Sequence, residues 1–575
     1  MAKTFRLTRS QEWQHQLRSS LHPAIFGGAY KLADIAMDAM HLFPPFRASM
    51  LVALPGALQS VFAALGDFYT WKLAMDIFGR ESNAPWAALW MTVLNPWQWY
   101  CSTRTFSNSL ETTLTIAALA YWPRELVGDL KDVKSAALQQ KGSVKSLRIS
   151  LILAAIAVLL RPTNIFIWLG VLTLTITRLT LDGKSPISKN SLLVLAREIL
   201  LCGSAALAVS VASDRLYFGF WTFPPYKWLY FNMSQSLAVF YGRMPWHYYL
   251  VQGIPLLTTT FLPFALVGLY KATSTSKTLS ASQSNTLKTL SFSAISMVAI
   301  LSLVSHKEVR FIYPLLPILH IVAAPFITSF FTVPQPKETT SPGPVTLRHK
   351  ISLGNILSIN LFLAGYLSLY HQGATLSVLN FLRGDFEHIH PESLSLHSAP
   401  SSNELFALFL TPCHSTPWRS HLVYPSLRAR ALTCEPPLHT APGSVERELY
   451  LDEADRFYLR DSTRNNTYGI NFLQEEMWPL KDNKRQGEIP RYIVGFEGIE
   501  PILQDFFSGE GKDMGVTLTR AWEGFNGLFN EDWRRSGQLV VWDTGVYASP
   551  SPSPPPPPPA TTKDAIEKEL PVHEL

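Results

Sequence analysis

Apolar residues in the first 370 positions of the chain gather into nine runs, which are separated by polar loops. Several runs are shorter than the ~20 residues of an ideal membrane-spanning helix, so some must tilt or be covered by neighbouring helices. One buried core accounts for one or two such runs, whereas nine would leave a soluble fold almost no polar surface. The pattern therefore predicts a polytopic bundle of membrane helices. The runs occupy residues 50–66, 86–100, 110–123, 149–177, 199–213, 254–270, 290–304, 311–332 and 351–370.

Composition and charge agree with this prediction. Of the 575 residues, 47% are hydrophobic and only 16% are charged, which is an excess of apolar residues for a soluble protein. Basic residues gather in four loops, which we expect in the cytosol because Lys and Arg are retained on that side. The net charge of +6 is explained by these loops and gives no reason to expect nucleic-acid binding. The four loops are residues 124–148, 178–197, 271–288 and 337–350.

The run at residues 149–177 has a basic loop on each side, so it must cross the membrane an even number of times. Arg161 and Pro162 interrupt it in the middle. We therefore predict a broken or V-shaped pair of helices instead of one span. The loops left on the far side of the membrane are residues 101–109, 214–253, 305–310 and everything after about residue 371.

The turn Ser305–Arg310, with the sequence SHKEVR, places four ionisable groups between two apolar runs. Basic residues are unusual on the far side of the membrane, so something other than topology should retain them. One interpretation is that Lys307 and Arg310 extend to lipid headgroups and Glu308 neutralises one of them. The other is that Lys307 and Arg310 hold an anionic lipid headgroup, while His306 and Glu308 orient the donor or the acceptor.

A second far-side turn, CSTRTFSNSLET at residues 101–112, favours the second interpretation. Arg104, Asn108 and Glu111 are spaced by four and three residues, which brings them to one face if the helix has begun there. The same residues are also compatible with an ordinary helix N-terminus that carries a capping box. Two turns that each combine Arg with a carboxylate predict one shared site at this surface, with Arg104 as a further phosphate contact.

These residues resemble a known family. The segment SHKEVRFIYPLLP looks like the hallmark of the dolichyl-phosphate-mannose-dependent mannosyltransferases of the endoplasmic reticulum, glycosyltransferase family 22. TRTFSNSLET and the intramembrane LLRPTN, which contains Arg161, are similar to that family and occur in the same order. TPCHSTPWRSHLV (411–423) and YLDEADRFY (450–458) resemble the branch that acts in GPI-anchor assembly.

The resemblance implies a mainly α fold, a polytopic membrane bundle of GT-C type. It also implies transfer of the third, α1,2-linked mannose from dolichyl-phosphate-mannose to the GPI precursor glycolipid, by an enzyme of the endoplasmic reticulum membrane. Inversion at the sugar needs one carboxylate as general base, and the lipid phosphate can leave without a metal. The chain contains no Asp-x-Asp sequence, which argues against a metal-dependent transferase that uses a nucleotide sugar. We expect no metal and no cofactor beyond the lipid-linked donor.

The general base is expected to be missing from this chain. Family members begin with a span and a luminal loop that carries the acidic residue, and residues 1–30 resemble only the end of such a loop. Asp34 and Asp38 lie at helix spacing, but a solvated face of an interfacial helix is the favoured interpretation. The catalytic residue therefore stays unknown.

Four regions are predicted along the chain. Residues 1–49 are a luminal-loop remnant with an interfacial helix, 50–370 the transmembrane domain, 371–548 a small luminal α/β domain, and 549–575 a Pro-rich disordered tail. The strands of the α/β domain are expected at ELFALFL, RYIVGF and QLVVW, with a helix at ILQDFF. Asn232 and Asn465 begin glycosylation sequons, and Cys413 and Cys434 could pair in an oxidising lumen.

Three alternatives to this function remain at this point. The chain could be a truncated or inactive relative that binds lipid intermediates or partner subunits. It could be a sister mannosyltransferase of N-glycan precursor assembly. A polytopic transporter is the third, but it should show paired broken helices, and only Arg161–Pro162 provides one.

Overall fold

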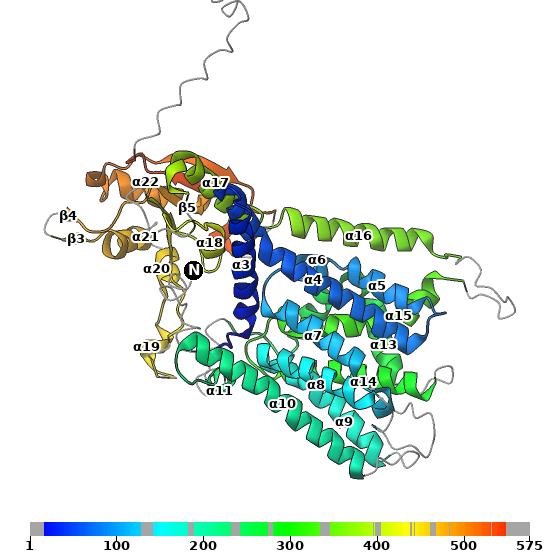
Figure 1. Ribbon diagram of the computed structural model, residues 1–575. Coiled ribbons are helices and arrows are strands. Elements are labelled where there is room, and N and C mark those ends of the chain that lie inside the picture. Colours follow the sequence, from blue (N-terminus) through cyan, green and yellow to red (C-terminus); the bar gives the residue numbers. More distant parts are fainter. Residues whose placement is uncertain are drawn as a thin grey trace, which may run out of the picture.

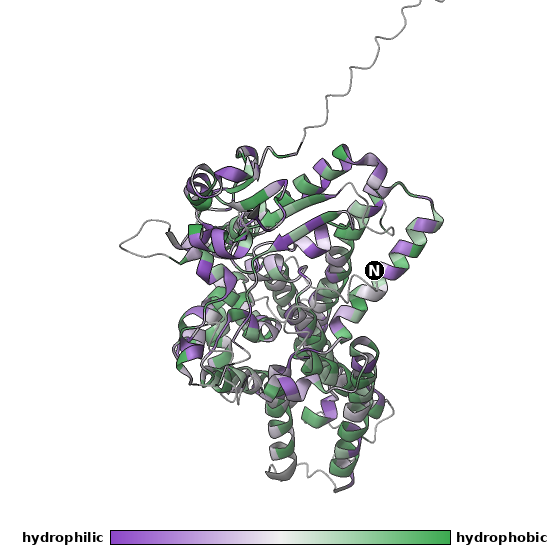
Figure 2. Ribbon diagram, turned by 90° about the vertical axis from the view of Figure 1, so that its left-hand side faces the viewer, coloured by the Kyte–Doolittle hydropathy of each residue, from purple (hydrophilic) through white to green (hydrophobic). Residues whose placement is uncertain are grey.

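A computed structural model of the chain describes residues 16–127, 138, 142–181, 189–230, 232, 242–273, 280–333, 346–394, 396, 404–437, 440–441, 443–459, 467–481, 484–528, 530 and 532–547. It contains a bundle of long helices and an α/β domain at one end of that bundle (Figure 1). Hydrophobic residues dominate the helices of the bundle, and hydrophilic stretches are more frequent in the C-terminal domain (Figure 2).

All nine predicted runs fall on helices of the bundle. Among the described residues, six helical segments are long and apolar enough to cross a membrane. The others are shorter or more polar, as in α7, whose Thr and Ser side chains are mostly buried. The helices are α4 (Pro44–Phe78), α5 (Ala84–Val93), α6 (Pro96–Cys101), α7 (Ser107–Tyr121), α8 (Ser143–Leu160), α9 (Ile165–Leu181), α10 (Lys189–Phe218), α12 (Ile254–Thr258), α13 (Leu262–Thr273), α14 (Ala281–Ser302), α15 (Leu316–Phe331) and α16 (Lys350–Leu369).

The predicted break at Arg161 is confirmed. Helix α8 ends at Leu160, and Arg161 adopts an extended backbone with φ −143° and ψ 100°. The following Pro162 explains this, because its ring disfavours the helical region for the residue before it. A 3₁₀ turn, η2 (Pro162–Asn164), then leads into α9. The interruption turns the backbone at Arg161 inside the bundle, where this side chain is only 8% exposed.

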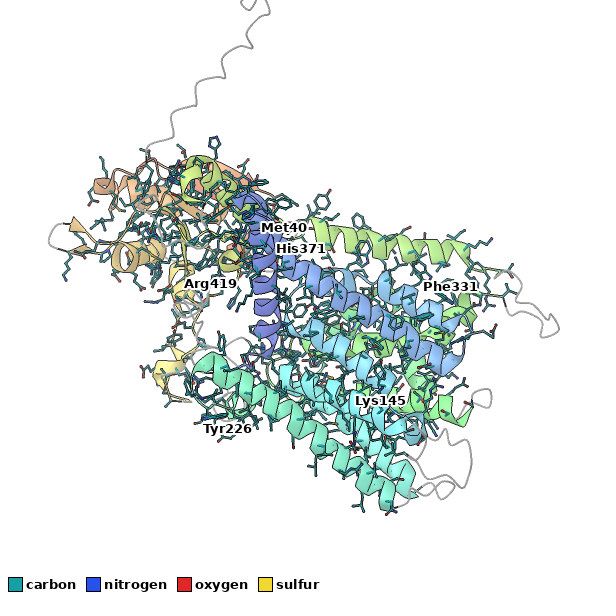
Figure 3. The ribbon with its side chains drawn as sticks, in the orientation of Figure 1. Met40, Lys145, Tyr226, Phe331, His371 and Arg419 are labelled. Atoms are coloured by element: carbon teal, nitrogen blue, oxygen red, sulfur yellow. A yellow bond between two sulfur atoms is a disulfide. The ribbon has the colours of Figure 1, made fainter. Side chains whose placement is uncertain are left out.

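The two ends of the bundle differ as the basic loops predict. Lys145 of α8 and Phe331 of α15 lie at the end far from the C-terminal domain, next to loops expected in the cytosol (Figure 3). Met40, His371 and Tyr226 of α11 (Pro224–Leu229) lie at the opposite end (Figure 3). We call this opposite end, which carries the C-terminal domain, the domain end.

Helix α15 runs through the centre of the bundle. Most of its side chains are buried, including Leu316, Ile318, Ile321 and Val322, which is typical of a helix that is hydrophobic all round. It packs against α5 and α13. Side chains of α7 and of the 3₁₀ segment η7 (Val309–Leu315) join the same core.

The contact between α13 and α15 supplies a stability prediction. A Cβ added to Gly268 would lie 2.4 Å from the carbonyl oxygen of Val322, so the two backbones approach too closely for any larger residue. We expect Gly268→Ala to lower the free energy of unfolding by about 1–3 kcal/mol through overpacking. The control is Gly354→Ala in α16, where an added Cβ meets no atom within 4 Å. Thermal unfolding in detergent measures both variants, and equal melting temperatures would contradict the close contact.

Helix α3 (Leu21–Ala39) lies across the domain end, roughly perpendicular to the bundle helices (Figure 1). Asp214 of α10 fixes its start, because the carboxylate accepts hydrogen bonds from the backbone N–H of Ser20 at 2.6 Å and from the Ser19 hydroxyl at 3.2 Å. Asp34 and Asp38 of α3 both pair with Arg47 of α4, each at 2.9 Å. These carboxylates therefore tie α3 to α4.

The C-terminal domain contains a five-stranded mixed sheet in the order β2-β1-β5-β7-β6. Its strands are β1 (Leu405–Phe409), β2 (Leu427–Ala431), β5 (Tyr492–Phe496), β6 (Thr519–Gly524) and β7 (Leu539–Asp543). β1 is parallel to β2 and β5, while β7 is antiparallel to β5 and β6. The three predicted strands correspond to β1, β5 and β7, and the predicted helix at ILQDFF lies in α22 (Glu500–Ser508). The two edge strands were not predicted.

Helices cover both faces of this sheet. Alternate strand residues point to opposite sides, so Ala407 and Phe409 pack with α17 (Ala374–Ile389), whereas Leu408 packs with α20 (Glu453–Tyr458) and α22. Cys413 and Cys434 form a disulfide in this domain, which suits an oxidising compartment. The predicted mainly α membrane bundle with a small α/β C-terminal domain is confirmed.

Candidate active site at the domain end

The turn Ser305–Arg310 is organised around Glu308. Arg310 forms a forked pair with both carboxylate oxygens, and its Nη2 donates to Oε1 at 2.7 Å. The Nε2 of His306 lies 3.0 Å from the same Oε1, and its Nδ1 lies 3.2 Å from the carbonyl oxygen of Gly242. Glu308 therefore fixes the positions of a guanidinium group and an imidazole ring at the start of η7.

Glu308 stays ionised at neutral pH. Burial by itself would raise the pKa of this carboxyl, but the hydrogen bonds from His306 and Arg310 outweigh it and lower the pKa from 4.5 to about 2. The negative charge is thus permanent under physiological conditions, and it keeps Arg310 in place.

Lys307 has a different role in the turn. Its side chain is 3% exposed, and the ammonium group donates to the carbonyl oxygens of Met244, at 3.0 Å, and of Val304. Burial lowers the pKa of this group. The backbone N–H of Met244 in turn donates to the carbonyl of Ser305 at 3.0 Å. Lys307 therefore fastens the segment Gly242–Met244 to the turn.

Arg161 reaches this turn from the break between α8 and α9. Its guanidinium carbon lies 5.7 Å from the centre of the Phe311 ring, and that of Arg310 lies 5.9 Å from the same centre. Arg161 interacts electrostatically with Arg310, Glu308 and Glu111. The structure thus brings together two arginines that are 149 positions apart in the sequence.

A buried polar network holds Arg161 from the other side. Arg161 Nη2 donates to Asn108 Oδ1, and Asn108 Nδ2 donates to Glu111 Oε2 at 3.1 Å. Asn164 Nδ2 donates to Glu111 Oε1 at 2.9 Å and to the Thr115 hydroxyl at 2.8 Å. Glu111 is fully buried. Asn108 and Glu111 are therefore placed to position Arg161, and the RPTN segment returns Asn164 to the same carboxylate.

Two residues of this site were missed by the sequence analysis. Arg18 and His22 lie before and within the first turn of α3, and both interact electrostatically with Arg161. Burial, followed by the charges of Arg18 and Arg161, lowers the pKa of His22 to about 4, so its ring is neutral at pH 7. The anchoring of Ser19 and Ser20 on Asp214 fixes both side chains, but nothing in the local sequence predicts that long-range contact.

Other predicted residues lie apart from this cluster. Arg104 is exposed, lies 3.9 Å over the Tyr100 ring and donates to the Tyr100 carbonyl, and it interacts with His371. Asn232 donates from its side-chain amide to the Trp228 carbonyl at 2.8 Å. Asn465 lies outside the described residues, so nothing is added to the prediction of a sequon there.

The arrangement is suited to an anion at the domain end. Arg161 and Arg310 present two guanidinium groups, and the oxygens of the carboxylates that position them, Glu111 and Glu308, already accept hydrogen bonds. Among the described residues, the Nε of Arg161 and the Nε2 of His22 are buried and have no hydrogen-bond partner. Buried donors of this kind are costly unless a ligand satisfies them. A phosphate group offers oxygen acceptors and negative charge together.

The family model of the Alg9-like mannosyltransferases matches residues 2–423 of the chain. The chain belongs to the Alg9-like mannosyltransferase family. The predicted resemblance to glycosyltransferase family 22 is thereby confirmed. In this member of the family, the match includes both turns of the site and the Arg161 break.

Relatives named GPI mannosyltransferase 3 align with nearly the whole of this Alg9-like chain. The protein from Gibberella zeae is 56% identical, covering 93% of this chain and 87% of the relative. The protein from Aspergillus fumigatus is 42% identical, with coverages of 92% and 71%. The human GPI alpha-1,2-mannosyltransferase 3 is 30% identical, with coverages of 86% and 73%. A crystal structure of ArnT from Cupriavidus metallidurans bound to undecaprenyl phosphate aligns with a TM-score of 0.44 and 12% identity, with coverages of 93% and 90%.

Proposed function

We propose that this chain is a GPI alpha-1,2-mannosyltransferase of the endoplasmic reticulum membrane. It transfers the third mannose from dolichyl-phosphate-mannose to the mannosylated glucosaminyl phosphatidylinositol precursor, at the luminal surface. The names of its relatives support the reaction. The observation that carries the choice of donor is that the guanidinium groups of Arg161 and Arg310 both lie within 6 Å of the Phe311 ring centre, at 5.7 and 5.9 Å, at the domain end of a membrane bundle.

The two arginines take the donor phosphate in this proposal. As the bond between mannose and phosphate breaks, negative charge develops on the leaving phosphate oxygen, and fixed guanidinium groups stabilise it. Glu308 positions Arg310, and Asn108 with Glu111 positions Arg161. His22 lies beside Arg161 and can donate to a phosphate or sugar oxygen, whereas both ring nitrogens of His306 are engaged by Glu308 and Gly242. We do not assign Lys307 to the phosphate, because its ammonium already donates to two backbone carbonyls, nor Arg104, which packs on the Tyr100 ring.

The acceptor hydroxyl must lose a proton during an inverting transfer. Asp34 and Asp38 are paired with Arg47, and Glu308 is held ionised by Arg310 and His306. We assign the general base to none of these residues. Our proposal for the chain's own part in the reaction is to bind and orient the phosphate and to stabilise its charge.

The proposal predicts the donor requirement. Membranes from cells that express the chain, in a background without the endogenous enzyme, should elongate the dimannosyl precursor when dolichyl-phosphate-mannose is supplied. GDP-mannose should fail as a direct donor when dolichyl-phosphate-mannose synthesis is blocked. Activity should survive EDTA, because guanidinium groups neutralise the leaving phosphate without a metal ion.

The same assay separates the alternatives. Loss of transfer in EDTA that is restored by manganese would contradict the proposed chemistry. Elongation of a lipid-linked oligosaccharide, with no elongation of the GPI precursor, would identify a sister enzyme of N-glycan assembly. No transfer to either acceptor, with retained binding of dolichyl-phosphate-mannose, would favour a relative that only binds lipid intermediates.

A further inference from the structure

The C-terminal domain contains a cavity of about 630 Å³ that lies outside the phosphate site. This volume falls within the range of ~300–1,000 Å³ that is typical of small-molecule sites. Side chains from α20 and from the 3₁₀ turn η12 (Trp533–Arg535) line most of it. The lining residues are Leu451, Asp455, Tyr458, Leu459, Asp532, Trp533 and Arg534.

One C-terminal motif of the sequence lines this cavity, and the other lies beside it. YLDEADRFY supplies Leu451, Asp455 and Tyr458 to the lining. TPCHSTPWRSHLV supplies Cys413, whose carbonyl accepts a hydrogen bond from Arg535 at 2.9 Å, next to the lining residues of η12. The proposed transfer reaction uses neither motif, so the cavity lined by YLDEADRFY needs another explanation.

The walls of the cavity are held in place by buried contacts. Asp452 caps α20 by accepting from the backbone N–H of Asp455 at 2.7 Å, and the Cys413–Cys434 disulfide lies beside its carboxylate. The Tyr458 hydroxyl donates to the Leu410 carbonyl at the end of β1, at 2.8 Å. A site built on such fixed positions can bind a ligand without first ordering its own walls.

The charged groups of the cavity form one connected set. Arg534 donates from Nη1 to Asp455 at 3.0 Å and from Nε to Asp532 at 2.9 Å. Arg535 also approaches Asp532, with its Nε 3.9 Å from Oδ2, so two guanidinium groups balance two carboxylates and leave no excess positive charge to attract a phosphate. Each carboxylate retains lone pairs that can accept from hydroxyl groups.

An aromatic surface lies next to this charged set. The Trp533 side chain is 45% exposed, and its ring meets that of Tyr458 edge to face, with centroids 6.1 Å apart. An indole face packs well against the C–H groups on one side of a pyranose, while carboxylate and guanidinium groups exchange hydrogen bonds with the hydroxyls at the ring edge. Neither a lipid chain nor an anion would use both features.

We propose that this cavity binds a neutral hexopyranose, such as a mannose residue of a glycan. Trp533 stacks on the sugar, and Asp455, Asp532 and Arg534 hold its hydroxyls. The glycan comes either from a mannosylated glycolipid headgroup or from an oligomannose chain on a glycoprotein, and both present the same pyranose chemistry. The inference goes beyond the proposed transfer and does not depend on it.

The test uses the full chain purified in detergent and saturation-transfer NMR with methyl α-D-mannopyranoside. The unmutated protein should bind saturably, and Trp533→Ala should weaken binding by about tenfold or more, the factor that follows from losing ~1.4 kcal/mol of contact. Trp86→Ala is the matched control, because Trp86 is 52% exposed but lies on α5. It should bind as the unmutated protein does.

A second variant tests whether weaker binding could result from misfolding instead of a lost contact. Asp532→Asn keeps the shape of the side chain and should also weaken binding, with the Cys413–Cys434 disulfide still resistant to thiol labelling. Saturable binding that is equal in Trp533→Ala and Trp86→Ala would overturn the proposal, as would no binding at all. Stronger binding of mannose 6-phosphate than of the neutral sugar would contradict the charge argument. Repeating the titration with a soluble dimannosyl glucosaminyl inositol and with an oligomannose N-glycan identifies the source.

Discussion

Replacing Arg161 with alanine is expected to lower mannosyl transfer by about 10²–10³-fold, the loss that follows removal of one fixed donor to a developing oxyanion. A side-chain network through Asn108 and Glu111 holds Arg161 inside the bundle. Its Nε has no hydrogen-bond partner among the described residues, and in the proposal the donor phosphate provides that partner.

Two further variants distinguish a loss of catalysis from a loss of folding. Arg161→Lys keeps a buried positive charge near Glu111 but loses the fork, so it should fold and still transfer poorly. Arg124→Ala is the control, because Arg124 is 53% exposed and pairs with Asp76 outside the site. Transfer is measured with radiolabelled dolichyl-phosphate-mannose, and thermal unfolding is measured on the same preparations. Full activity of Arg161→Lys would remove the forked phosphate contact from the proposal.

Glu308→Gln is expected to abolish complementation in cells that lack the endogenous enzyme. Glutamine offers one acceptor oxygen in place of two and no charge, so it cannot neutralise Arg310 or form the fork, and the guanidinium loses its position. We expect the Michaelis constant for the donor to rise and the rate constant to fall together. Normal growth with Glu308→Gln would mean that the turn only extends its charges to lipid headgroups.

Acid stability gives an independent measure of the same carboxylate. Its pKa is lowered from 4.5 to about 2, so its stabilising contribution is complete above about pH 4.5 and is lost as the pH falls toward 2. In detergent, the unmutated protein should therefore lose stability across this window more steeply than Glu308→Gln, which has no carboxyl to protonate. Parallel curves would show that Glu308 is not held by its two partners.

The helices of the bundle were predictable because each carries a long apolar run, and the break at Arg161 was predictable because Pro162 constrains the residue before it. The edge strands β2 and β6 were not predictable, since β6 is largely exposed, β2 is mostly half-buried, and both carry charged residues such as Arg428 and Glu523. Exposed edges lack the apolar run that identifies a central strand.

The candidate site was only partly predictable for a similar reason. Glu308 and Arg310 are two positions apart in an unusual turn, so their pairing could be inferred locally. Arg18 and His22 reach the site because Asp214, nearly 200 positions away in the sequence, holds the start of α3. No local pattern encodes such a contact. Likewise, only the structure distinguishes Lys307, which is buried on backbone carbonyls, from Arg310, which faces the site.

The buried Lys307 has one more consequence. Because its ammonium and His306 both bind carbonyls of the segment Gly242–Met244, the motif that holds Arg310 and this distant stretch of chain form one mechanical unit. Hydrogen bonds through Glu308 and His306 connect the guanidinium to the carbonyl of Gly242. Substitutions in the turn and in Gly242–Met244 are therefore expected to disturb the same arginine.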